Sequence, residues 1–437
     1  MTSGSVSSSS DGGNTPYRRT ALPNGLRVLT APMPTTRSVS MGFYIGAGSR
    51  YETDAEAGVS HYLEHMLFKG TEDRRTSKDI SETIERVGGF MNASTDREVT
   101  VYWVRVAHPH FELGLNLLSD MLLNSTFDAE EIEKERQVIL EEIHTVNDVP
   151  SQRAELLADA ALWPGQPLGR DIAGTPESVG GIDRKMLLSY MGQQYDPGNS
   201  VLSIAGHFEE HEALDLANSF LGGWGRKQPR TWIPAENPPN GNRCFVEYRR
   251  TEQSHICLTL PGIPANDPQR YAVDVLNALL GEGMASRLFL ELRENRGIVY
   301  EVSSSSLHLR DCGTMTVYAG SDPKQSPDAV QAILHELVHV AGNMEESELQ
   351  RARELVKGRL LLRLEDTRGV SGWLGAQELL LGQIHDPEEV VEALDQLTLA
   401  DLQSAAERVF RPELFRLAIV GPHRSSRRFD RLLEAVS

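Results

Sequence analysis

Two short stretches of this chain carry two histidines and a glutamate at the spacing of one helical turn. One is HYLEH at residues 61–65, and the other is HELVH at residues 335–339. Two histidines four residues apart on a helix can both reach one Zn²⁺ ion, and a glutamate on the same side can act on a water molecule. Both stretches are therefore candidate metal sites. In HYLEH the glutamate directly precedes the second histidine, whereas in HELVH it directly follows the first.

The first stretch has the amphipathic pattern that a site facing a cleft requires. If residues 59–68 are helical, His61, Glu64 and His65 fall on one stripe. The opposite stripe is apolar and would anchor the helix in a core; it comprises Val59, Tyr62, Leu63, Met66 and Leu67. A third ligand is still required, because catalytic zinc is held by three protein side chains.

A second predicted helix, with Asp128 as its N-cap, offers candidates for that third ligand. Glu135 and Glu142 share one stripe of this helix, beside a face rich in isoleucine. Taken by themselves, the two glutamates fit equally well the solvated face of an acidic helix. Local spacing therefore leaves both interpretations open.

The HELVH stretch imitates a metzincin motif, but its periodicity argues against a functional zinc site. His335 and His339 lie on the side of the predicted helix that faces away from its apolar stripe. That stripe comprises Val330, Ile333, Leu334, Leu337 and Ala341. A metzincin-like peptidase centred on these histidines remains an alternative that this pattern disfavours.

Composition indicates a soluble globular protein of more than one domain. The chain has 437 residues, of which 40% are hydrophobic and 24% charged, and no apolar run is long enough for membrane insertion. A net charge of -19 argues against nucleic acid and motivates an expectation of basic substrates. Three widely separated cysteines without a CxxC pair fit reduced thiols in a cytoplasmic protein.

The chain divides into two halves that resemble each other. Residues 1–16 are Ser/Gly-rich and predict a disordered tail, and a Gly/Pro-rich linker is predicted at 223–242. The domains predicted on either side, 17–222 and 243–437, each begin with strand patterns and continue into helical ones, which indicates α+β. Residues 127–142 align without gaps on 344–359, and 59–70 on 272–283, so a duplicated domain is expected.

The motifs together resemble a known family. HYLEHMLFKGT at residues 61–71, GGFMNASTDREVTVYW at 88–103 and EKERQVILEEI at 133–143 resemble the pitrilysin-type (M16) zinc peptidases. The size resembles the short branch, which includes bacterial and mitochondrial processing peptidases. The resemblance implies two homologous domains, each a mostly antiparallel sheet packed with helices, joined by a linker as half of a clamshell.

The resemblance also implies roles for the acidic and histidine side chains. In the family pattern the third ligand lies 77 residues beyond the second histidine, which is Glu142 here. His61, His65 and Glu142 would then bind one zinc ion per chain. Glu64 would be the catalytic base, and Glu135 the second acidic residue that supports the site.

The second half does not repeat this ligand set. At the aligned positions it carries Asp274, Asn277 and Ala278 in place of the HxxEH residues, and Ala352 and Arg359 in place of the two glutamates. The C-terminal domain is therefore expected to keep the scaffold and to lack the metal site.

Four further residues are assigned to the substrate by resemblance. Arg293 and Tyr300, in RENRGIVY, match a family pair that contacts the substrate or its tetrahedral intermediate. Asn92 and Ala93 lie in a predicted strand to whose edge an extended peptide adds. In the family four domains enclose the substrate, so a homodimer is expected, with a homologous partner subunit as the other possibility.

These features predict a zinc-dependent endopeptidase, an inverzincin that hydrolyses extended peptides or presequence-like segments by metal-activated water. The alternative of another class is a non-catalytic scaffold or subunit of the same fold. The intact set of His61, Glu64, His65 and Glu142 argues against that alternative.

Overall fold

The computed structural model describes residues 17–238 and 241–436, so the tail predicted at 1–16 lies outside the described residues. The chain forms two compact units. Unit 1 holds the described residues up to Ile143, Asp171–Ile233 and Leu361–Asp386, and unit 2 holds the remaining segments, His144–Arg170, Pro234–Leu360 and those from Pro387 onward. Both units combine one sheet with helices, which confirms the α+β prediction. The predicted linker and domain limits remain predictions.

Unit 1 is built on a six-stranded sheet with the order β1-β2-β6-β3-β5-β4. Neighbouring strands are antiparallel except for the parallel pair of β2 and β6. The strands are β1 (Arg18–Ala21), β2 (Arg27–Pro32), β3 (Ser38–Ile45), β4 (Phe90–Thr95), β5 (Thr100–Ala107) and β6 (Ser200–Gly206). The helices are α1 (Val59–Met66), α2 (Ser77–Glu85), α3 (Phe111–Asn124), α4 (Ala129–Asp148, shared with unit 2), α6 (Pro176–Gly181), α7 (Arg184–Gln194), α8 (Glu210–Leu221) and α12 (Thr367–Leu380).

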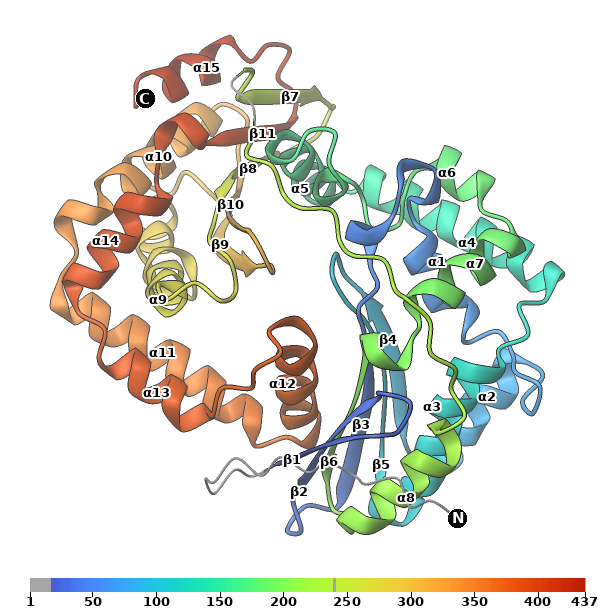
Figure 1. Ribbon diagram of the computed structural model, residues 1–437. Helices are drawn as coiled ribbons and strands as arrows, with labels where there is room; N and C mark the ends of the chain where they lie inside the picture. Colours follow the sequence, from blue (N-terminus) through green and yellow to red (C-terminus); the bar gives the residue numbers. More distant parts are fainter. Residues whose placement is uncertain (1–16, 239–240, 437) are drawn as a thin grey trace. The chain divides into compact units, whose positions relative to one another are not determined.

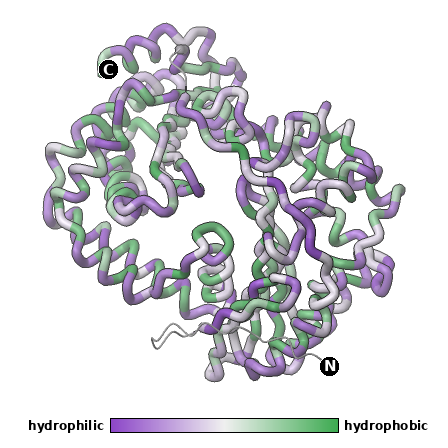
Figure 2. Tube along the Cα trace, viewed as in Figure 1, coloured by the Kyte–Doolittle hydropathy of each residue, from purple (hydrophilic) through white to green (hydrophobic). Residues whose placement is uncertain are grey.

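The main core of unit 1 lies between one face of this sheet and helices α1, α3, α7 and α8 (Figure 1). β3 and β6 are buried almost throughout, as expected for central strands with both faces covered. β5 alternates between buried and half-buried residues, and β4 between exposed and half-buried ones. In Figure 2 hydrophobic and hydrophilic residues alternate along the helices, which fits their amphipathic packing.

Unit 2 repeats this topology in a five-stranded sheet with the order β7-β11-β8-β10-β9. The pair of β7 and β11 is parallel and the other pairs are antiparallel. The strands are β7 (Cys244–Tyr248), β8 (Ser254–Pro261), β9 (Glu301–His308), β10 (Gly313–Ser321) and β11 (Arg416–Gly421). The helices are α5 (Pro150–Leu162), α9 (Arg270–Gly281), α10 (Ser326–Asn343), α11 (Glu346–Leu364, ending in unit 1), α13 (Pro387–Asp395), α14 (Leu399–Val409) and α15 (Arg427–Glu434), with a π-helix, η6 (Phe289–Asn295).

The equivalent strand orders support the duplication predicted from the sequence, but the two halves exchange one helix. α5 lies in the first half of the sequence and packs against β8 and β11 of unit 2, where Ala154 and Ala158 join a small core. α12 lies in the second half of the sequence and packs against β3 and β6 of unit 1. A Cβ on Gly375 would come within 2.2 Å of the Tyr44 ring, so a glycine permits this close approach.

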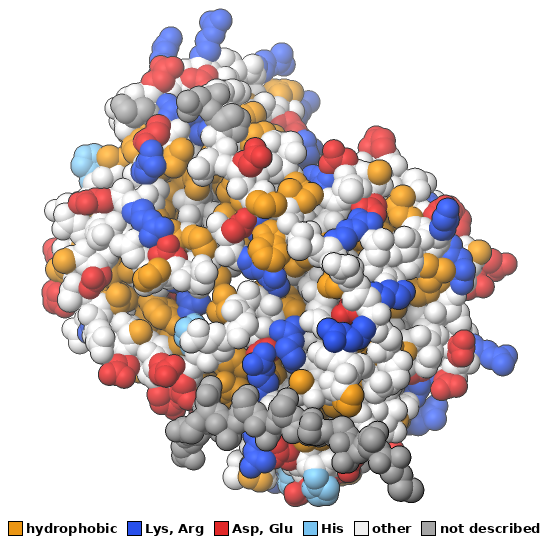
Figure 3. Space-filling model, in the orientation of Figure 1, with side chains coloured by type: hydrophobic (Ala, Val, Ile, Leu, Met, Phe, Trp, Pro, Cys, Tyr) orange, Lys and Arg blue, Asp and Glu red, His pale blue; other side chains and the backbone are white. Residues whose placement is uncertain are grey.

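Acidic and basic side chains are interspersed over the face that Figure 3 shows, and the net negative charge does not gather there into one acidic patch. Two of the three cysteines, Cys244 and Cys257, are buried thiols. Across the described ranges, every helix is too short or too polar to traverse a lipid bilayer.

Candidate metal centre and peptide-binding edge

Helix α1 is held at its N-terminus by a buried carboxylate. Glu52 is 1% exposed and accepts hydrogen bonds from the amides of Gly58 at 2.9 Å and Ser60 at 2.8 Å. These amides have no partner within the helix, and the helix dipole favours a negative charge there. Gly58 has a φ of 93°, and a Cβ at this position would lie 2.5 Å from the Ala173 carbonyl oxygen. Glycine is therefore required where α1 begins.

The predicted apolar stripe of α1 is confirmed. Val59, Tyr62, Leu63, Met66 and Leu67 are all at most 1% exposed, and they anchor the helix in the core of unit 1. His61, Glu64 and His65 are only partly buried on the other side. The polar stripe is thus rigidly supported, which a site of fixed geometry requires.

His61 and His65 of α1 and Glu142 of α4 bring three donor atoms together. The Nε2 atoms of His61 and His65 are 3.3 Å apart. Glu142 Oε2 lies 3.8 Å from His61 Nε2 and 3.6 Å from His65 Nε2. Four ligands about 2.0–2.2 Å from a tetrahedral zinc ion are separated from one another by about 3.3–3.6 Å. The donor spacing therefore fits a single zinc ion.

The protonation of His61 also fits a metal ligand. Burial, together with the neighbouring charge of His65, lowers the pKa of His61 to about 4. The imidazole is thus neutral near pH 7, which leaves its Nε2 lone pair available. Within the described part of the chain, these three side chains are the one group of at least three histidine, cysteine or acidic residues with donor atoms this close.

Glu64 is hydrogen-bonded to the edge strand. The hydroxyl of Thr95, the last residue of β4, donates to Glu64 Oε2 at 2.6 Å. Burial raises the pKa of Glu64, and the Thr95 hydrogen bond acts against that rise. A carboxylate with a raised pKa is suited to accept and return a proton near neutral pH.

Glu135 connects a histidine to a lysine. One of its oxygens lies 2.8 Å from His65 Nδ1, and the other lies 2.5 Å from Lys69 Nζ. Glu135 is 5% exposed; burial would raise its pKa, but the hydrogen bonds to His65 and Lys69 hold the pKa below its usual value. Such a carboxylate fixes the imidazole orientation so that Nε2 faces the other donors.

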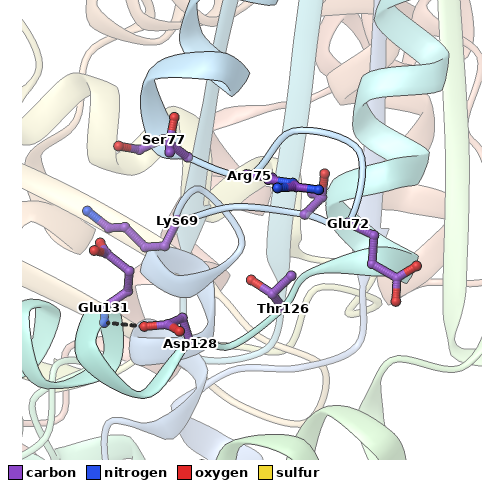
Figure 4. A pocket seen from close by; sticks show the side chains of 9 residues that line it. Lys69, Glu72, Arg75, Ser77, Thr126, Asp128 and Glu131 are labelled. Carbon is purple, nitrogen blue, oxygen red and sulfur yellow. Dashed lines mark hydrogen bonds between the residues drawn. The ribbon is translucent and has the colours of Figure 1, made fainter.

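A pocket of about 530 Å³ lies beside Lys69, at the start of α4. Figure 4 shows Lys69, Asp128 and Glu131 around it, and the dashed line joins Asp128 to the Glu131 amide at 3.3 Å. Asp128 also accepts from the Glu130 amide at 2.8 Å, so it caps the helix as the sequence predicts. This cap fixes the start of the helix that carries both glutamates of the site.

Asn92 and Ala93 lie in β4, at the edge of the unit 1 sheet. β4 pairs with β5 on one side, with Asn92 opposite Trp103 and Ala93 opposite Tyr102. The Ala93 amide donates to the side chain of its neighbour Asn92 at 2.8 Å. The predicted contacts of Asn92 and Ala93 with a peptide stay predictions.

Arg293 and Tyr300 belong to unit 2. The Arg293 guanidinium lies 5.0 Å from the centre of the Phe289 ring within η6. Tyr300 is 56% exposed, and its amide donates to the Gly320 carbonyl at 2.8 Å. Their predicted contacts with substrate stay predictions.

The positions in unit 2 that align with the zinc motif form a different network. Asp274 accepts a hydrogen bond from His308 at 3.0 Å. Asn277 contacts Ser304 at 2.7 Å, and Arg359 pairs with Glu282. Side chains at the positions that align with the zinc motif thus form contacts within the second unit.

The second histidine pair lies where its periodicity predicts. His335 and His339 are exposed on α10, and their rings stack with centres 4.3 Å apart. His339 Nδ1 donates to the His335 carbonyl at 2.8 Å. Four residues of the predicted apolar stripe, Val330, Ile333, Leu334 and Leu337, are buried, and Ala341 is partly buried.

Two models of one protein family match most of the chain. The model described as insulinase (peptidase family M16) matches residues 27–176, and that of the peptidase M16 inactive domain matches residues 181–356. The chain belongs to peptidase family M16. An uncharacterized zinc protease of Streptomyces coelicolor is 35% identical over 96% of this chain and 92% of its own length. One of Bacillus subtilis is 34% identical over 93% of this chain and 98% of its own length.

Solved structures share the M16 peptidase fold. A protease from Helicobacter pylori matches with a TM-score of 0.86 at 21% identity, covering 93% of this chain and 99% of its own. A chain of complex III2 from Candida albicans matches with a TM-score of 0.82 at 20% identity, covering 96% and 99%. The naming of M16 relatives as zinc proteases supports a metallopeptidase role with zinc as the metal.

Two residues of the site were not predicted from the sequence. Thr95 lies on β4, which pairs with β5, and it contacts Glu64 of α1 through the tertiary fold. The spacing of the two residues in the sequence gives no sign of this contact. Lys69 lies one helical turn beyond His65, a spacing that could have pointed to a shared partner.

Proposed function

We propose that this chain is a zinc-dependent endopeptidase that hydrolyses extended peptides or presequence-like segments. The observation that supports it is the convergence of His61, His65 and Glu142 at the donor spacing of a single zinc ion. The two helices that carry these residues are anchored in one core, so the arrangement is built into the fold of unit 1.

In this proposal His61, His65 and Glu142 hold one zinc ion per chain. Zinc, when bound, would act as a Lewis acid that polarises the peptide carbonyl and acidifies water. Glu64 would take the proton of the attacking water and later deliver it to the leaving amine. Thr95 keeps the Glu64 carboxylate on the side of the edge strand.

Glu135 and the substrate residues complete the proposed site. Glu135 would orient His65 through Nδ1, and Lys69 offsets the charge of this buried carboxylate. Asn92 and Ala93 would align an extended peptide along β4 through main-chain hydrogen bonds. Arg293 and Tyr300, from this chain or from a second copy, would stabilise the developing oxyanion.

The proposed assembly is a homodimer that encloses the peptide, with a homologous partner subunit as the other option. Strand addition reads main-chain groups, so unfolded segments are expected as substrates in preference to folded proteins. The alternative function is that of a non-catalytic subunit, since a chain of Candida albicans complex III2 has the same fold. Retention of the complete donor set favours the enzyme.

The decisive experiment compares the full-length wild type with Glu64→Gln. Both are loaded with zinc and incubated with an unstructured peptide that is blocked at both ends, so that only internal cleavage is detected by mass spectrometry. E64Q should keep one zinc per chain and lose at least about 100-fold in cleavage rate. Cleavage by E64Q at the wild-type rate would refute the assigned base.

A matched control uses the other histidine pair. The double variant H335A/H339A should keep the zinc content and the cleavage rate of the wild type, because both residues are exposed on α10. Loss of one zinc equivalent in this variant would show that the metal is bound by His335 and His339 in unit 2.

A further inference from the structure

A second pocket of unit 1 lies on the sheet face that α12 covers. It has a volume of about 530 Å³ and is lined mainly by residues of β3, β4, β5, the end of α11 and the start of α12. Figure 1 shows α12 beside β3 on this side of the sheet. The residues that matter here are Tyr44, Ser94, Trp103, Arg363, Asp366 and Arg368.

Strand β4 connects this pocket to the proposed peptide site. Thr95 faces α1, where it donates to Glu64, whereas its neighbour Ser94 lines the pocket. Successive side chains of a strand point to opposite faces. A peptide added to the edge of β4 would alternate in the same way, so every second side chain would be directed to the pocket side.

The pocket side of β4 is open. Phe90, which alternation places on the same face as Ser94, is 68% exposed. Asn92 lies between them on that face and is exposed as well. A row of exposed side chains on an edge strand offers a bound peptide a second contact surface beside the main-chain hydrogen bonds.

The charge of the pocket is positive. Arg363 and Arg368 are exposed, and among the described residues neither has a carboxylate within ion-pair distance. Asp366 also lines the pocket, but one of its oxygens pairs with Arg105 at 2.8 Å. The other caps α12 by accepting from the Arg368 amide at 2.7 Å. Two guanidinium groups thus remain available for a ligand.

Arg368 is held in place by an aromatic ring. Its guanidinium lies 3.8 Å from the centre of the Trp103 ring, which is half-buried in β5. Stacking of this kind leaves the edge of the guanidinium free to donate two parallel hydrogen bonds to a carboxylate. In the strand order β3-β5-β4, an added strand would lie two strand spacings, or about 10 Å, from β5. An extended Glu side chain of that strand and the guanidinium of Arg368 over Trp103 would have to reach toward each other to span this distance.

We propose that this pocket is a subsite for an acidic side chain, Asp or Glu, of a peptide bound along β4. This inference rests on the proposed function and names a preference for its substrate. It is opposite to the basic preference expected from the net charge of -19, because the charge next to the bound peptide, rather than the sum over the chain, acts at short range.

The test uses a neutral, unstructured, fluorescent peptide in which Glu, Gln or Lys is placed at each position in turn. Each peptide is made with a free and with an amidated C-terminus. Cleavage is followed with the zinc-loaded wild type, and binding to E64Q is measured separately by fluorescence anisotropy. At one position, or at positions two apart, Glu should be preferred over Gln by about tenfold and Lys should be disfavoured.

Substitutions identify the groups responsible. R363Q and R368Q should each reduce the Glu-to-Gln ratio, and R363E should shift the preference toward Lys, which loss of structure would not produce. R363Q leaves the stack of Arg368 on Trp103 intact. The control R86Q removes an exposed arginine of unit 1 that pairs with Glu82, and it should keep the wild-type ratio.

Several outcomes would overturn the subsite. Equal cleavage and binding of Glu, Gln and Lys peptides at every position would do so, as would a Glu preference that persists in the R363Q/R368Q double variant. A preference that depends only on a free C-terminus would assign the carboxylate to the chain end instead. If the wild type cleaves no peptide, the proposed function fails, while anisotropy with E64Q still decides whether the pocket selects acidic side chains.

Discussion

Thr95 on the edge strand β4 donates a hydrogen bond to Glu64 on α1, with 2.6 Å between Oγ1 and Oε2. This contact joins the strand along which a peptide is proposed to bind to the carboxylate proposed as the base. One side chain thus links the edge strand to the proposed base.

Replacing Thr95 by Val should therefore reduce catalysis more than binding. The hydrogen bond lowers the pKa of Glu64 against the effect of burial, so its loss should raise that pKa further. A hydrogen bond to a charged group contributes about 1.5–3 kcal/mol, which corresponds to a fall in kcat of about 10- to 100-fold. KM should change little, because the main chain of β4 is retained.

The dependence of kcat on pH distinguishes an effect of Thr95 on Glu64 from a purely structural effect of Thr95, because a structural effect would not shift this profile. Since Glu64 must be deprotonated to act as a base, the acid limb of kcat should shift to higher pH in T95V. Thr95→Ser keeps the hydroxyl and should restore both the rate and the profile. An unshifted acid limb in T95V would show that Thr95 does not act through Glu64.

Lys69 should act on the metal site through Glu135. Replacing Lys69 by Met removes the ion pair at 2.5 Å and leaves the buried carboxylate with His65 alone. We expect a loss of about 10- to 100-fold in zinc affinity, measured by competition with a chromophoric chelator, as for other groups that orient a metal ligand. K69R should recover part of the loss.

The matched control for Lys69 is Lys78, which is exposed on α2 and pairs with Glu82 at 3.4 Å. K78M should bind zinc as tightly as the wild type, because exposed ion pairs contribute little. Equal affinities for K69M and the wild type would mean that Glu135 orients His65 without the lysine.

The sequence was sufficient for the local elements of the site. The apolar stripe of α1 and the cap at Asp128 follow from residue types and helical spacing, and both are confirmed. The choice of Glu142 required the family resemblance, since spacing alone did not separate a third ligand from a solvated helix face. Its neighbour on the stripe, Glu135, is buried and contacts His65 instead of lying beside Nε2.

Features that depend on tertiary packing were not predictable. The amphipathic pattern of α12 shows that one of its faces is buried, but it does not show which sheet provides the contact. Its place on β3, beside Tyr44, depends on the close approach that Gly375 allows. The pocket with Arg363 and Arg368 exists only because of this packing, so the charge of the proposed subsite could not be derived from the net charge.

Removal of zinc should lower the thermal stability of the protein, and this effect should depend on Glu142 as a ligand. A metal ion that joins α1 to α4 stabilises the folded chain by about 2.7 kcal/mol when its concentration is 100 times its Kd. Chelation should then lower the Tm of the wild type by several degrees, as measured by calorimetry. Glu142→Gln should contain less than one zinc per chain, and chelator should have little further effect on its Tm.

Glu130 offers the control, because it is an exposed glutamate on the first turn of the same helix. E130Q should bind zinc and respond to chelator like the wild type. A Tm of E142Q that falls on chelation as much as that of the wild type would exclude Glu142 as a ligand.

The stability of unit 2 should depend on pH through Asp274 and His308. Burial disfavours the charged imidazole, but the hydrogen bond from His308 to Asp274 at 3.0 Å outweighs it, and the pKa of His308 is raised above 6.5. A raised pKa in the folded state stabilises the protein fully below the unfolded value of about 6.5. That stabilisation is lost as the pH rises through the folded value.

Asp274→Asn should therefore lower the free energy of unfolding by about 1 kcal/mol near pH 5.5 and by much less near pH 9. The measurement is the thermal midpoint as a function of pH, with Asp328→Asn as a control, since Asp328 is an exposed residue 4.0 Å from Arg428. A pH-independent effect of D274N would show that the charge of His308 is not involved. Because Asp274 occupies the position that aligns with His61, the predicted result would mean that the second unit uses this position for stability at acid pH.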